Sequence, residues 1–350
     1  MSFLKVVLWP FTLLYNLVMK VRNYLYDIGH KPSFKFESVV ISVGNLNVGG
    51  SGKTPMVEYL VRLLQDKYSL AILSRGYGRK TKGFRFATEE DDAYSLGDEP
   101  FQYYRKFGDN VTICVCEERA LAIPTILNER PSTQIILLDD AFQHRTVAPQ
   151  FSLLLTDAGR PFYEDFVMPF GRLREGRRGA KRADTIVVTK CTNATAPEAV
   201  QRKIEKYAGQ KPIFFSTISY KSAQPFEMGT IIGNKVVLVS GIANSSSLER
   251  YVAEHYQLIK HFQFSDHHSY TREDIRMLQK FLNEHQADSI LTTEKDMVKL
   301  ISAHLSKVID GKIWFFLPVE TIFFNNGLVF DNLISQTVEA HLKQVGQSPI

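Results

Sequence analysis

A glycine-rich turn that ends in Gly52, Lys53 and Thr54 is the part of the sequence with the most specific chemistry. Glycines let backbone N–H groups approach phosphate oxygens, and the positive end of a helix dipole adds to the attraction. A lysine in this position reaches the β- and γ-phosphates of a nucleotide, and the threonine hydroxyl can bind Mg²⁺. The segment GNLNVGGSGKT (44–54) follows an apolar run and precedes a helical pattern, as in a P-loop. It departs from the strict P-loop pattern at Asn47, which replaces a glycine.

Two adjacent carboxylates, Asp139 and Asp140, end a second apolar run, IILLDD. A P-loop domain needs an acidic residue at the end of a neighbouring strand, where it serves Mg²⁺ or the water bound to it. Because adjacent side chains of a strand point to opposite faces, we expect the two aspartates to have different roles. One would serve Mg²⁺, and the other would orient a group or accept a proton. A solvated strand end is the alternative interpretation.

A basic segment and a pair of adjacent histidines are further candidates for functional sites. The basic segment could hold the phosphates of a nucleotide, a substrate or an anionic lipid, or it could be a solvated loop. It lacks interleaved aromatic residues, so nucleic-acid binding is disfavoured. His267 and His268 follow Asp266 in a polar break, where no residue at helical ligand spacing supports a metal site, so structural or solvated histidines are the alternative. The basic segment consists of Arg172, Arg174, Arg177, Arg178, Lys181 and Arg182, against the single acid Glu175.

The N-terminal segment contains an uncharged apolar stretch, residues 6–19, which lies between Lys5 and Lys20. The stretch is shorter than the ~20 residues that a membrane-spanning helix needs, and no cleavage site of a signal peptide follows it. Aromatic side chains with flanking cations are typical of a helix that lies on a membrane surface. A first helix docked on the protein's own core is the alternative.

The composition is that of a globular protein, whose folded core can hold the segments described above in fixed positions. The chain has 350 residues, of which 44% are hydrophobic and 23% charged, so collagen-like and mostly disordered classes are excluded. This length allows about two domains. A net charge of +5 is too small to indicate nucleic-acid binding by itself. Three cysteines provide no disulfide framework and indicate a reducing compartment.

Short apolar runs that alternate with helical patterns predict an α/β fold with a mainly parallel sheet of the P-loop NTPase type. A second, smaller α/β domain is expected after a polar, turn-rich segment. We expect an N-terminal membrane-surface helix (1–30), a P-loop domain (31–225), the smaller domain (226–325) and a C-terminal helix that returns to the P-loop domain (326–350). The expected strands are 37–43, 69–74, 110–116, 134–140, 151–157, 184–190, 212–218, 235–241, 288–293 and 312–319, and two of the expected helices are 53–67 and 271–285.

The class of nucleotide-dependent protein is narrowed by motifs that the sequence lacks. Guanine-specific GTPases carry an Asn/Thr-Lys-x-Asp element, and the nearest match, Thr189-Lys190-Cys191-Thr192, has no aspartate. The loops of protein kinases are also absent. Three classes remain: a phosphoryl-transfer enzyme, a membrane-bound switch that hydrolyses ATP, and a binding protein with a degenerate nucleotide site.

Taken together, the motifs resemble those of the tetraacyldisaccharide 4′-kinases, the membrane-associated lipid A kinases of Gram-negative bacteria. The most specific matching segments are SVGNLNVGGSGKTP (42–55) and LDDAFQHR (138–145). The loop of this family also lacks the strict first glycine, so Asn47 agrees with it. The other matching segments are SRGYGR (74–79), LGDEP (96–100), MPFGRLRE (168–175), SGIAN (240–244), FSDHHSY (264–270) and TTEKDMVKL (292–300).

The resemblance implies an activity, a location and partners. The activity is phosphorylation of the 4′-hydroxyl of a tetraacylated glucosamine disaccharide 1-phosphate by ATP with Mg²⁺, which gives lipid IVA in lipid A biosynthesis. The location is the cytoplasmic face of the bacterial inner membrane, as a peripheral or monotopic protein. The implied partners are the acylated disaccharide lipid and the membrane surface, with no nucleic acid and no obligate protein partner.

The resemblance also implies a nucleotide site. Lys53 and Thr54 would serve the phosphates and Mg²⁺, and Asp139 would be the acid nearest to Mg²⁺. The other residues that would bind the nucleotide or support its site are Asn47, Val48, Gly49, Gly50, Ser51, Gly52, Arg75, Glu99, Gln143 and Glu175.

Four further residues are implied to be catalytic. Asp98 would lie near the substrate hydroxyl as a candidate base, and Arg174 would act on phosphate charge. Asp140 would pair with His267 from the second domain. Such a pair would form only when the two domains close on each other.

Overall fold

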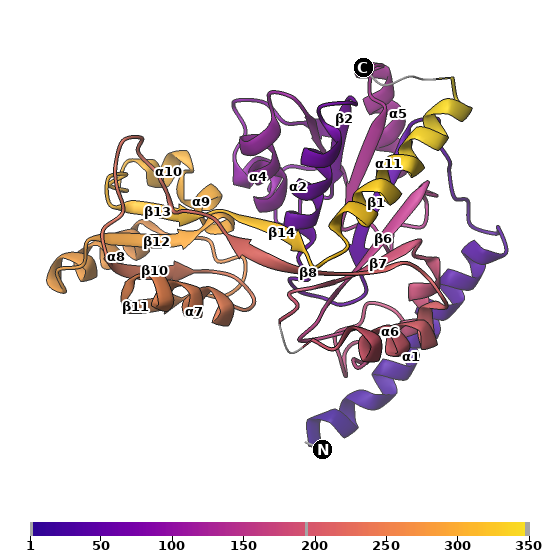
Figure 1. Cartoon of the computed structure of the whole chain (residues 1–350), viewed down its shortest axis with the longest axis horizontal. Coiled ribbons are helices and arrows are strands. Elements are labelled where there is room, and N and C mark those ends of the chain that lie inside the picture. The colour runs from indigo at the N-terminus through magenta and orange to yellow at the C-terminus, as the bar shows by residue number, and fades with distance from the viewer. Residues whose placement is uncertain (1–2, 193–194, 347–350) are drawn as a thin grey trace.

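Two β-sheets, each packed against helices, organise the chain in the computed structural model, which describes residues 3–192 and 195–346 (Figure 1). A nine-stranded, mainly parallel sheet forms the larger lobe, and a five-stranded sheet forms the smaller lobe. The predicted α/β fold class is therefore confirmed. Residues 1–2 of the predicted N-terminal helix and residues 347–350 of the predicted C-terminal helix lie outside the described residues. The helices are α1 (Phe3–Asp27), α2 (Lys53–Leu64), α3 (Ala93–Leu96), α4 (Asp98–Phe107), α5 (Arg119–Glu129), a 3-10 helix (Arg177–Arg182), α6 (Pro197–Ala208), α7 (Ser246–His255), α8 (Arg272–Glu284), α9 (Glu294–Leu300), α10 (Ala303–Ser306) and α11 (Gly327–Gln344).

The larger sheet has the strand that precedes the glycine-rich turn, β1 (Val39–Asn45), at its centre. Strands β5 and β6 pair with β1 in parallel, whereas the edge pairs β14–β8 and β3–β4 are antiparallel. Because the central strands are parallel, their carboxyl ends meet at one edge of the sheet, where ligands bind in such folds. The strand order is β14 (Val319–Phe323), β8 (Ile213–Tyr220), β7 (Thr185–Thr189), β6 (Phe151–Asp157), β1, β5 (Ile135–Asp139), β2 (Leu70–Ser74), β4 (Thr112–Val115) and β3 (Arg85–Phe86).

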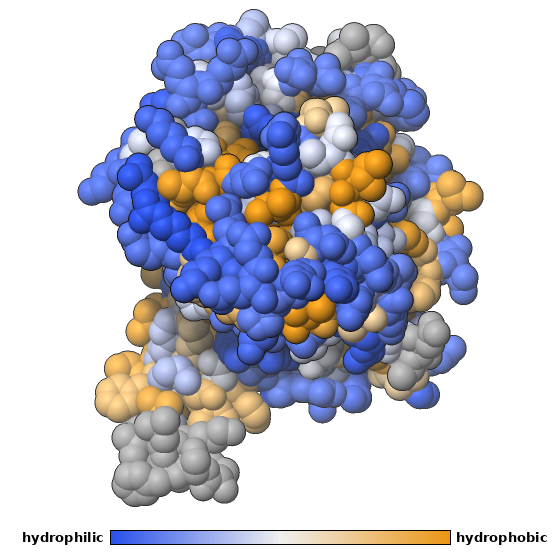
Figure 2. All heavy atoms as spheres, turned by 90° about the vertical axis from the view of Figure 1, so that its left-hand side faces the viewer, coloured by the Kyte–Doolittle hydropathy of each residue, from blue (hydrophilic) through white to orange (hydrophobic). Residues whose placement is uncertain are grey.

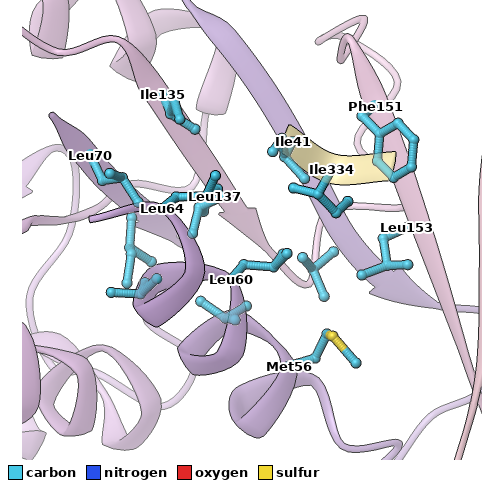
Figure 3. Close-up of a cluster of buried hydrophobic side chains, with 14 of the residues drawn as sticks. Ile41, Met56, Leu60, Leu64, Leu70, Ile135, Leu137, Phe151, Leu153 and Ile334 are labelled. Carbon is cyan, nitrogen blue, oxygen red and sulfur yellow. The ribbon is translucent and has the colours of Figure 1, made fainter. Parts of the chain in front are cut away.

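The core of the larger lobe is a cluster of buried apolar side chains between the sheet and α2 (Figure 3). All seven residues of β1 are buried, as expected for a strand covered on both faces. Met56, Leu60 and Leu64 recur every fourth residue, which places them on one face of α2. Burial of each such side chain contributes roughly 1.5–3 kcal/mol. Ile334 of α11 joins the same cluster, so the C-terminal helix packs on the larger lobe although it follows the smaller one in the chain.

The smaller lobe is a parallel sheet with one antiparallel edge strand. The expected single strand 312–319 is wrong, because the structure divides it into β13 (Trp314–Leu317) and β14, which belong to different sheets. Pro318 separates the two strands, since proline cannot donate a hydrogen bond to a sheet. Strand β14 pairs with β8, and these two strands lie between the lobes (Figure 1). The order of the smaller sheet is β11 (Gln257–Gln263), β10 (Lys235–Ser240), β12 (Ser289–Thr293), β13 and β9 (Gln224–Pro225).

Helix α1 runs along the outside of the larger lobe and projects beyond it at its N-terminal end (Figure 1). Within the described chain no helix is long and apolar enough to cross a membrane. One side of α1 is docked: the Thr12 hydroxyl accepts a hydrogen bond from the backbone N–H of Phe170 at 3.0 Å. The other side is apolar and exposed, and Figure 2 shows hydrophobic residues gathered at this projecting end. The exposed apolar side chains of α1 are Trp9, Phe11, Leu13, Leu14, Leu17, Val18, Val21 and Tyr24.

Candidate active site

The glycine-rich turn joins β1 to α2 at the carboxyl edge of the larger sheet. Gly49 (φ +114°) and Gly52 (φ +80°) adopt backbone angles that favour glycine. Gly52 is also the N-cap of α2, and no side chain in the described chain caps this helix. The buried hydroxyl of Ser51 likewise has no hydrogen-bond partner among the described residues. The first N–H groups of α2 and this hydroxyl are therefore available to phosphate oxygens.

Two residues at the end of β7 hold the turn in place. The Thr189 hydroxyl donates to the backbone carbonyl of Ser51 at 2.9 Å. Lys190, which has a left-handed φ of +55°, donates to the carbonyl of Gly50 and, at 2.8 Å, to the carboxylate of Asp157. Sequence reasoning treated Thr189 and Lys190 only as an incomplete guanine-recognition element and missed this contact. The available signal was their position at the end of a strand that belongs to the same parallel sheet.

The first residues of the turn are hydrogen-bonded to loops other than the end of β7. Asn47, which replaces the P-loop glycine, donates its side-chain amide to Asp165 Oδ2 at 3.0 Å. The backbone N–H of Val48 donates to the carbonyl of Arg172 at 2.8 Å. Asn47 therefore anchors the start of the turn to the protein's own carboxylate.

Lys53, Asp140 and Arg174 meet beside the turn. Arg174 donates to both carboxylate oxygens of Asp140, each at 2.9 Å, and Lys53 Nζ lies 3.7 Å from Asp140 Oδ1. Burial acts to raise the pKa of Asp140, but Lys53 and Arg174 together outweigh it and hold the pKa below its ordinary value. The expected pair of Asp140 with His267 is wrong in this structure, because two cations of the larger lobe already surround the carboxylate.

Asp139 is the buried member of the acidic pair, at the end of β5. Its Oδ2 accepts a hydrogen bond from the Ser74 hydroxyl at 3.2 Å, whereas Oδ1 has no hydrogen-bond partner in the described part of the chain. Burial, and then the charges of Asp140 and Glu99, raise the pKa of Asp139 to about 7. A buried carboxylate oxygen without a partner, next to a phosphate site, fits a divalent cation. Asp139 and the hydroxyl of Thr54 are the residues that would hold Mg²⁺.

A second charged group forms where the two lobes meet. His267 Nδ1, from the smaller lobe, lies 3.0 Å from Oδ2 of Asp98, the first residue of α4. Lys295 Nζ, at the start of α9, lies 3.2 Å from His267 Nε2 and 3.3 Å from Glu99 Oε1. The rings of Tyr77 and His267 have centroids 5.2 Å apart. Sequence reasoning placed Asp98 and His267 in the site but missed Lys295 and Tyr77, although both lie in segments that carry the family resemblance.

Gln143 and the buried Glu175 form a hydrogen-bonded network behind the basic segment. Gln143 Nε2 donates to the carbonyl of Asn45 at 3.0 Å and to Glu175 Oε1 at 3.1 Å. Arg182 donates to both oxygens of Glu175, at 2.7 and 2.8 Å. These contacts fix the basic segment against β1, so both predicted residues lie at the site as supports of its loops.

Arg75 and Arg119 add positive charge at the same edge of the sheet. Arg75 is exposed after β2, whereas Arg119 is fully buried and donates to the backbone carbonyl of Asp139 at 3.4 Å. Burial, followed by the charges of Arg119 and Arg75, lowers the pKa of His144 to about 4. His144 is therefore neutral at physiological pH. Arg119 was missed by sequence reasoning, because nothing in its local sequence distinguishes it from a surface arginine.

Helix α1 contacts the loops of this site directly. Arg22 donates to the carbonyl of Gln143 at 2.7 Å, and Asn23 Nδ2 donates to Glu175 Oε2 at 2.7 Å. The Tyr15 hydroxyl donates to a backbone carbonyl of the basic segment at 2.9 Å. The helix with the exposed apolar face is thus bonded to the same loops that orient the charged residues.

Comparisons with known proteins identify the family of the chain. The sequence model of the family described as tetraacyldisaccharide-1-P 4′-kinase matches residues 4–339. The tetraacyldisaccharide 4′-kinase of Cytophaga hutchinsonii is 38% identical over 351 residues, which cover 99% of this chain and 99% of that protein. The corresponding protein of Flavobacterium johnsoniae is 39% identical, over 98% of this chain and 100% of that protein.

A solved structure agrees with these relatives. The crystal structure of LpxK from Aquifex aeolicus in complex with ATP has a TM-score of 0.74 and 28% sequence identity to this chain. The similarity covers 96% of this chain and 99% of that chain. The predicted family is confirmed: the chain belongs to the tetraacyldisaccharide-1-P 4′-kinase family.

Proposed function

We propose that this chain transfers the γ-phosphate of ATP to the 4′-hydroxyl of a tetraacyldisaccharide 1-phosphate at the cytoplasmic face of the bacterial inner membrane, which gives lipid IVA in lipid A biosynthesis. The proposal rests on one observation: α1, with its exposed apolar side, is hydrogen-bonded to the loops that lie beside a phosphate-binding turn. Membership of the family supports the reaction, and the similar structure in complex with ATP supports the nucleotide.

The phosphates of ATP would be held by the N–H groups of the turn, by the N-terminus of α2 and by Lys53. Thr54 and Asp139 would hold Mg²⁺, which when bound neutralises charge on the phosphates. Arg174, fixed by its pair with Asp140, would face the charge that develops on the transferred group. Such a site suits phosphoryl transfer, which needs positioning and charge neutralisation more than a strong base.

Asp98 would accept the proton of the 4′-hydroxyl. As the hydroxyl oxygen bonds to the γ-phosphorus, the bond from phosphorus to the oxygen of the β-phosphate breaks, ADP leaves, and the proton moves to the carboxylate. His267, 3.0 Å from the same carboxylate, would orient it. Because Asp98 and His267 belong to different lobes, the pair would be complete only when the lobes are together, which limits access of water to the γ-phosphate.

The exposed side of α1 would lie in the membrane surface, where amphipathic helices bury their apolar side chains at the headgroup boundary. Arg172, Arg178 and Lys181 are exposed in the basic segment that α1 contacts, and they would meet anionic headgroups. The acyl chains of the substrate could then stay in the bilayer while its sugar reaches the phosphate site.

Transfer of label from γ-labelled ATP to tetraacyldisaccharide 1-phosphate in detergent micelles tests the reaction. We expect labelled lipid with the wild-type chain and none with Lys53→Ala. Lys203→Ala is the matched control, because Lys203 is exposed, pairs with the exposed Glu164 and lies over the ring of Tyr163. Labelled free phosphate without labelled lipid would contradict the proposal and identify an ATPase switch. Nucleotide binding with neither product would instead identify a binding protein.

Binding to vesicles that contain anionic lipid tests the membrane role of α1. Leu14 and Leu17 are 62% and 58% exposed, and replacing both with glutamate puts two charges on the apolar side. We expect this variant to leave the vesicles and to lose turnover of vesicle-embedded lipid, while it keeps its affinity for ATP. Leu121→Glu on α5 is the control, since Leu121 is equally exposed at 66%. Unchanged vesicle binding and turnover would show that α1 has another purpose.

A further inference from the structure

Lys295 contacts the histidine of the cross-lobe pair at the ring nitrogen that Asp98 leaves free. Lys295 Nζ lies 3.2 Å from His267 Nε2, while His267 Nδ1 lies 3.0 Å from Asp98 Oδ2. Both ring nitrogens are therefore engaged by charged groups of the protein. Lys295 belongs to the segment TTEKDMVKL (292–300), to which the reaction described above assigns no role.

The chemistry of these neighbours fixes the position of the ring proton. A lysine ammonium has three donors and no acceptor, so His267 Nε2 must accept its hydrogen bond and carries no proton. A neutral imidazole then carries its proton on Nδ1, and this N–H donates a hydrogen bond to the Asp98 carboxylate. We propose that Lys295 is a positioning residue that holds His267 neutral with its proton on Nδ1, and thereby leaves the Asp98 carboxylate as the acceptor of the substrate proton. This inference rests on the proposed function, because it assigns the proton acceptor of that reaction.

The surroundings of Lys295 keep it charged. Burial acts to lower the pKa of Lys295, but the carboxylates of Glu99, Asp266 and Asp98 outweigh it, so the pKa lies above its ordinary value. Lys295 Nζ lies 3.3 Å from Glu99 of α4 and 3.3 Å from Asp266 in the loop that carries His267. The ammonium is thus held between the two lobes and remains a donor to Nε2 at neutral pH.

This arrangement differs from one in which the histidine is the base. In a Ser-His-Asp triad the imidazole donates Nδ1–H to a carboxylate and takes up the substrate proton at a free Nε2. In this chain the nearest charged group to Nε2 of His267 is the Lys295 ammonium at 3.2 Å, and the Asp266 carboxylate, 4.0 Å from Nε2, is itself paired with that ammonium. A second proton on the ring would therefore bring two positive charges into contact. The proton released by the hydroxyl therefore goes to the Asp98 carboxylate, whose negative charge His267 stabilises through Nδ1–H.

Nitrogen NMR of the full-length chain labelled with ¹⁵N-histidine measures the ring protons directly. The chain has nine histidines, and His267→Gln identifies the signals of His267 by their absence. We expect wild-type His267 at neutral pH to have a protonated Nδ1 and an unprotonated Nε2. A proton on Nε2 in the wild-type chain would overturn the proposal without the need for any variant of Lys295.

Lys295→Met tests the cause, because methionine keeps an unbranched apolar stem and removes the ammonium. Lys280→Met is the matched control, since Lys280 is exposed on α8 and forms an ion pair with the exposed Glu284 of the same helix. We expect Lys295→Met to lose the signal of unprotonated Nε2 and to lower kcat roughly 10- to 100-fold, with the KM for ATP nearly unchanged. Lys295→Arg, which keeps the donor charge, should restore part of both.

A His267 spectrum that does not respond to Lys295→Met would overturn the proposal, even if kcat falls, because the role of Lys295 would then be structural. The spectrum needs no lipid substrate. Absence of lipid phosphorylation by the wild-type chain would therefore overturn the proposed function alone, while the ring protonation still decides the role of Lys295.

Discussion

The phosphate half and the proton half of the site are built in different ways. The phosphate half is one continuous segment, 44–54, between a buried strand and the helix that follows it. The proton half consists of Asp98, His267 and Lys295, which come from three segments of two lobes. Asp98 and His267 alone are 169 residues apart in the chain.

This difference follows from what each half must do. Phosphate oxygens carry fixed charge, and the consecutive backbone N–H groups of the turn can bind them together with Lys53 of the same segment. A proton acceptor must instead be placed against one hydroxyl of a separate substrate, and its ionisation must be controlled by neighbours. A half built locally keeps its shape when the lobes move, whereas a half built across the lobes depends on their arrangement. We therefore expect nucleotide binding and phosphoryl transfer to be separable by substitution.

Asp98→Asn, compared with Lys53→Ala, tests whether the two halves act independently and has the largest expected effect. Asparagine keeps the shape of Asp98 but cannot accept the proton, so kcat should fall by about two to four orders of magnitude. ATP affinity, measured by calorimetry, should stay at the wild-type value. Lys53→Ala should lose affinity and turnover together, because it removes the cation that reaches the phosphates.

If Asp98→Asn weakens ATP binding as much as Lys53→Ala does, the two halves are not independent. Titration of both variants with ATP and with ADP distinguishes these outcomes. ADP lacks the γ-phosphate, so its affinity reports the turn and α2 more directly than the proton half.

The phosphate half was predictable from the sequence because its determinants are local. The glycines, Lys53 and Thr54 stand next to each other, and a strand before and a helix after them are readable from apolar spacing. The buried strands were predictable for the same reason, since short apolar runs such as IILLDD are typical of the buried strands of a parallel sheet. Asp139 could be placed at the carboxyl edge of the sheet from its position in that run alone.

The pairing within the proton half could not be predicted from the residues. The sequence alone is compatible with a pair of His267 with Asp98 or with Asp140, and the packing of the lobes decides between these two partners. Electrostatics explains the outcome, because Asp140 is already neutralised by Arg174 and Lys53. Lys295 was missed for a related reason: a lysine in the first turn of a helix is usually a solvated residue, and its burial between two lobes is a tertiary property.

Lys190→Met should have an intermediate effect and tests whether the turn is as self-contained as its sequence suggests. The substitution removes the donor that holds the Gly50 carbonyl and leaves Asp157 without its cation. A hydrogen bond from a charged group contributes about 1.5–3 kcal/mol, so the KM for ATP should rise roughly tenfold or more, with a smaller change in kcat. The measurement is initial-rate kinetics over a range of ATP concentrations.

Lys203→Met, at an exposed ion pair, is the control for this substitution. A KM for ATP that does not change in Lys190→Met would mean that the turn keeps its shape without support from β7. The two halves would then differ more than we propose, because the phosphate half would keep its shape without contacts from other segments.

Glu294→Gln should have the smallest effect and tests the lobe junction on which the proton half depends. Glu294 of α9 and the buried Glu58 of α2 share the ammonium of Lys106, which lies 2.6 and 2.7 Å from them. Burial, and then the charge of Glu58, raise the pKa of Glu294 above its ordinary value, although Lys106 opposes them. The folded chain thus holds this proton more tightly than the unfolded chain does. Its stability should therefore fall as the pH rises through and above the ordinary glutamate range.

Glutamine cannot ionise, so Glu294→Gln should remove this part of the pH dependence. Above about pH 7 we expect the variant to be more stable than the wild-type chain by roughly 1–2 kcal/mol, which raises Tm by a few degrees. Thermal unfolding between about pH 5 and 8 measures the slope for the variant, the wild type and the exposed control Glu284→Gln. Equal slopes for wild type and Glu294→Gln would mean that Lys106 neutralises both carboxylates fully, and that the junction holds the lobes together independently of pH.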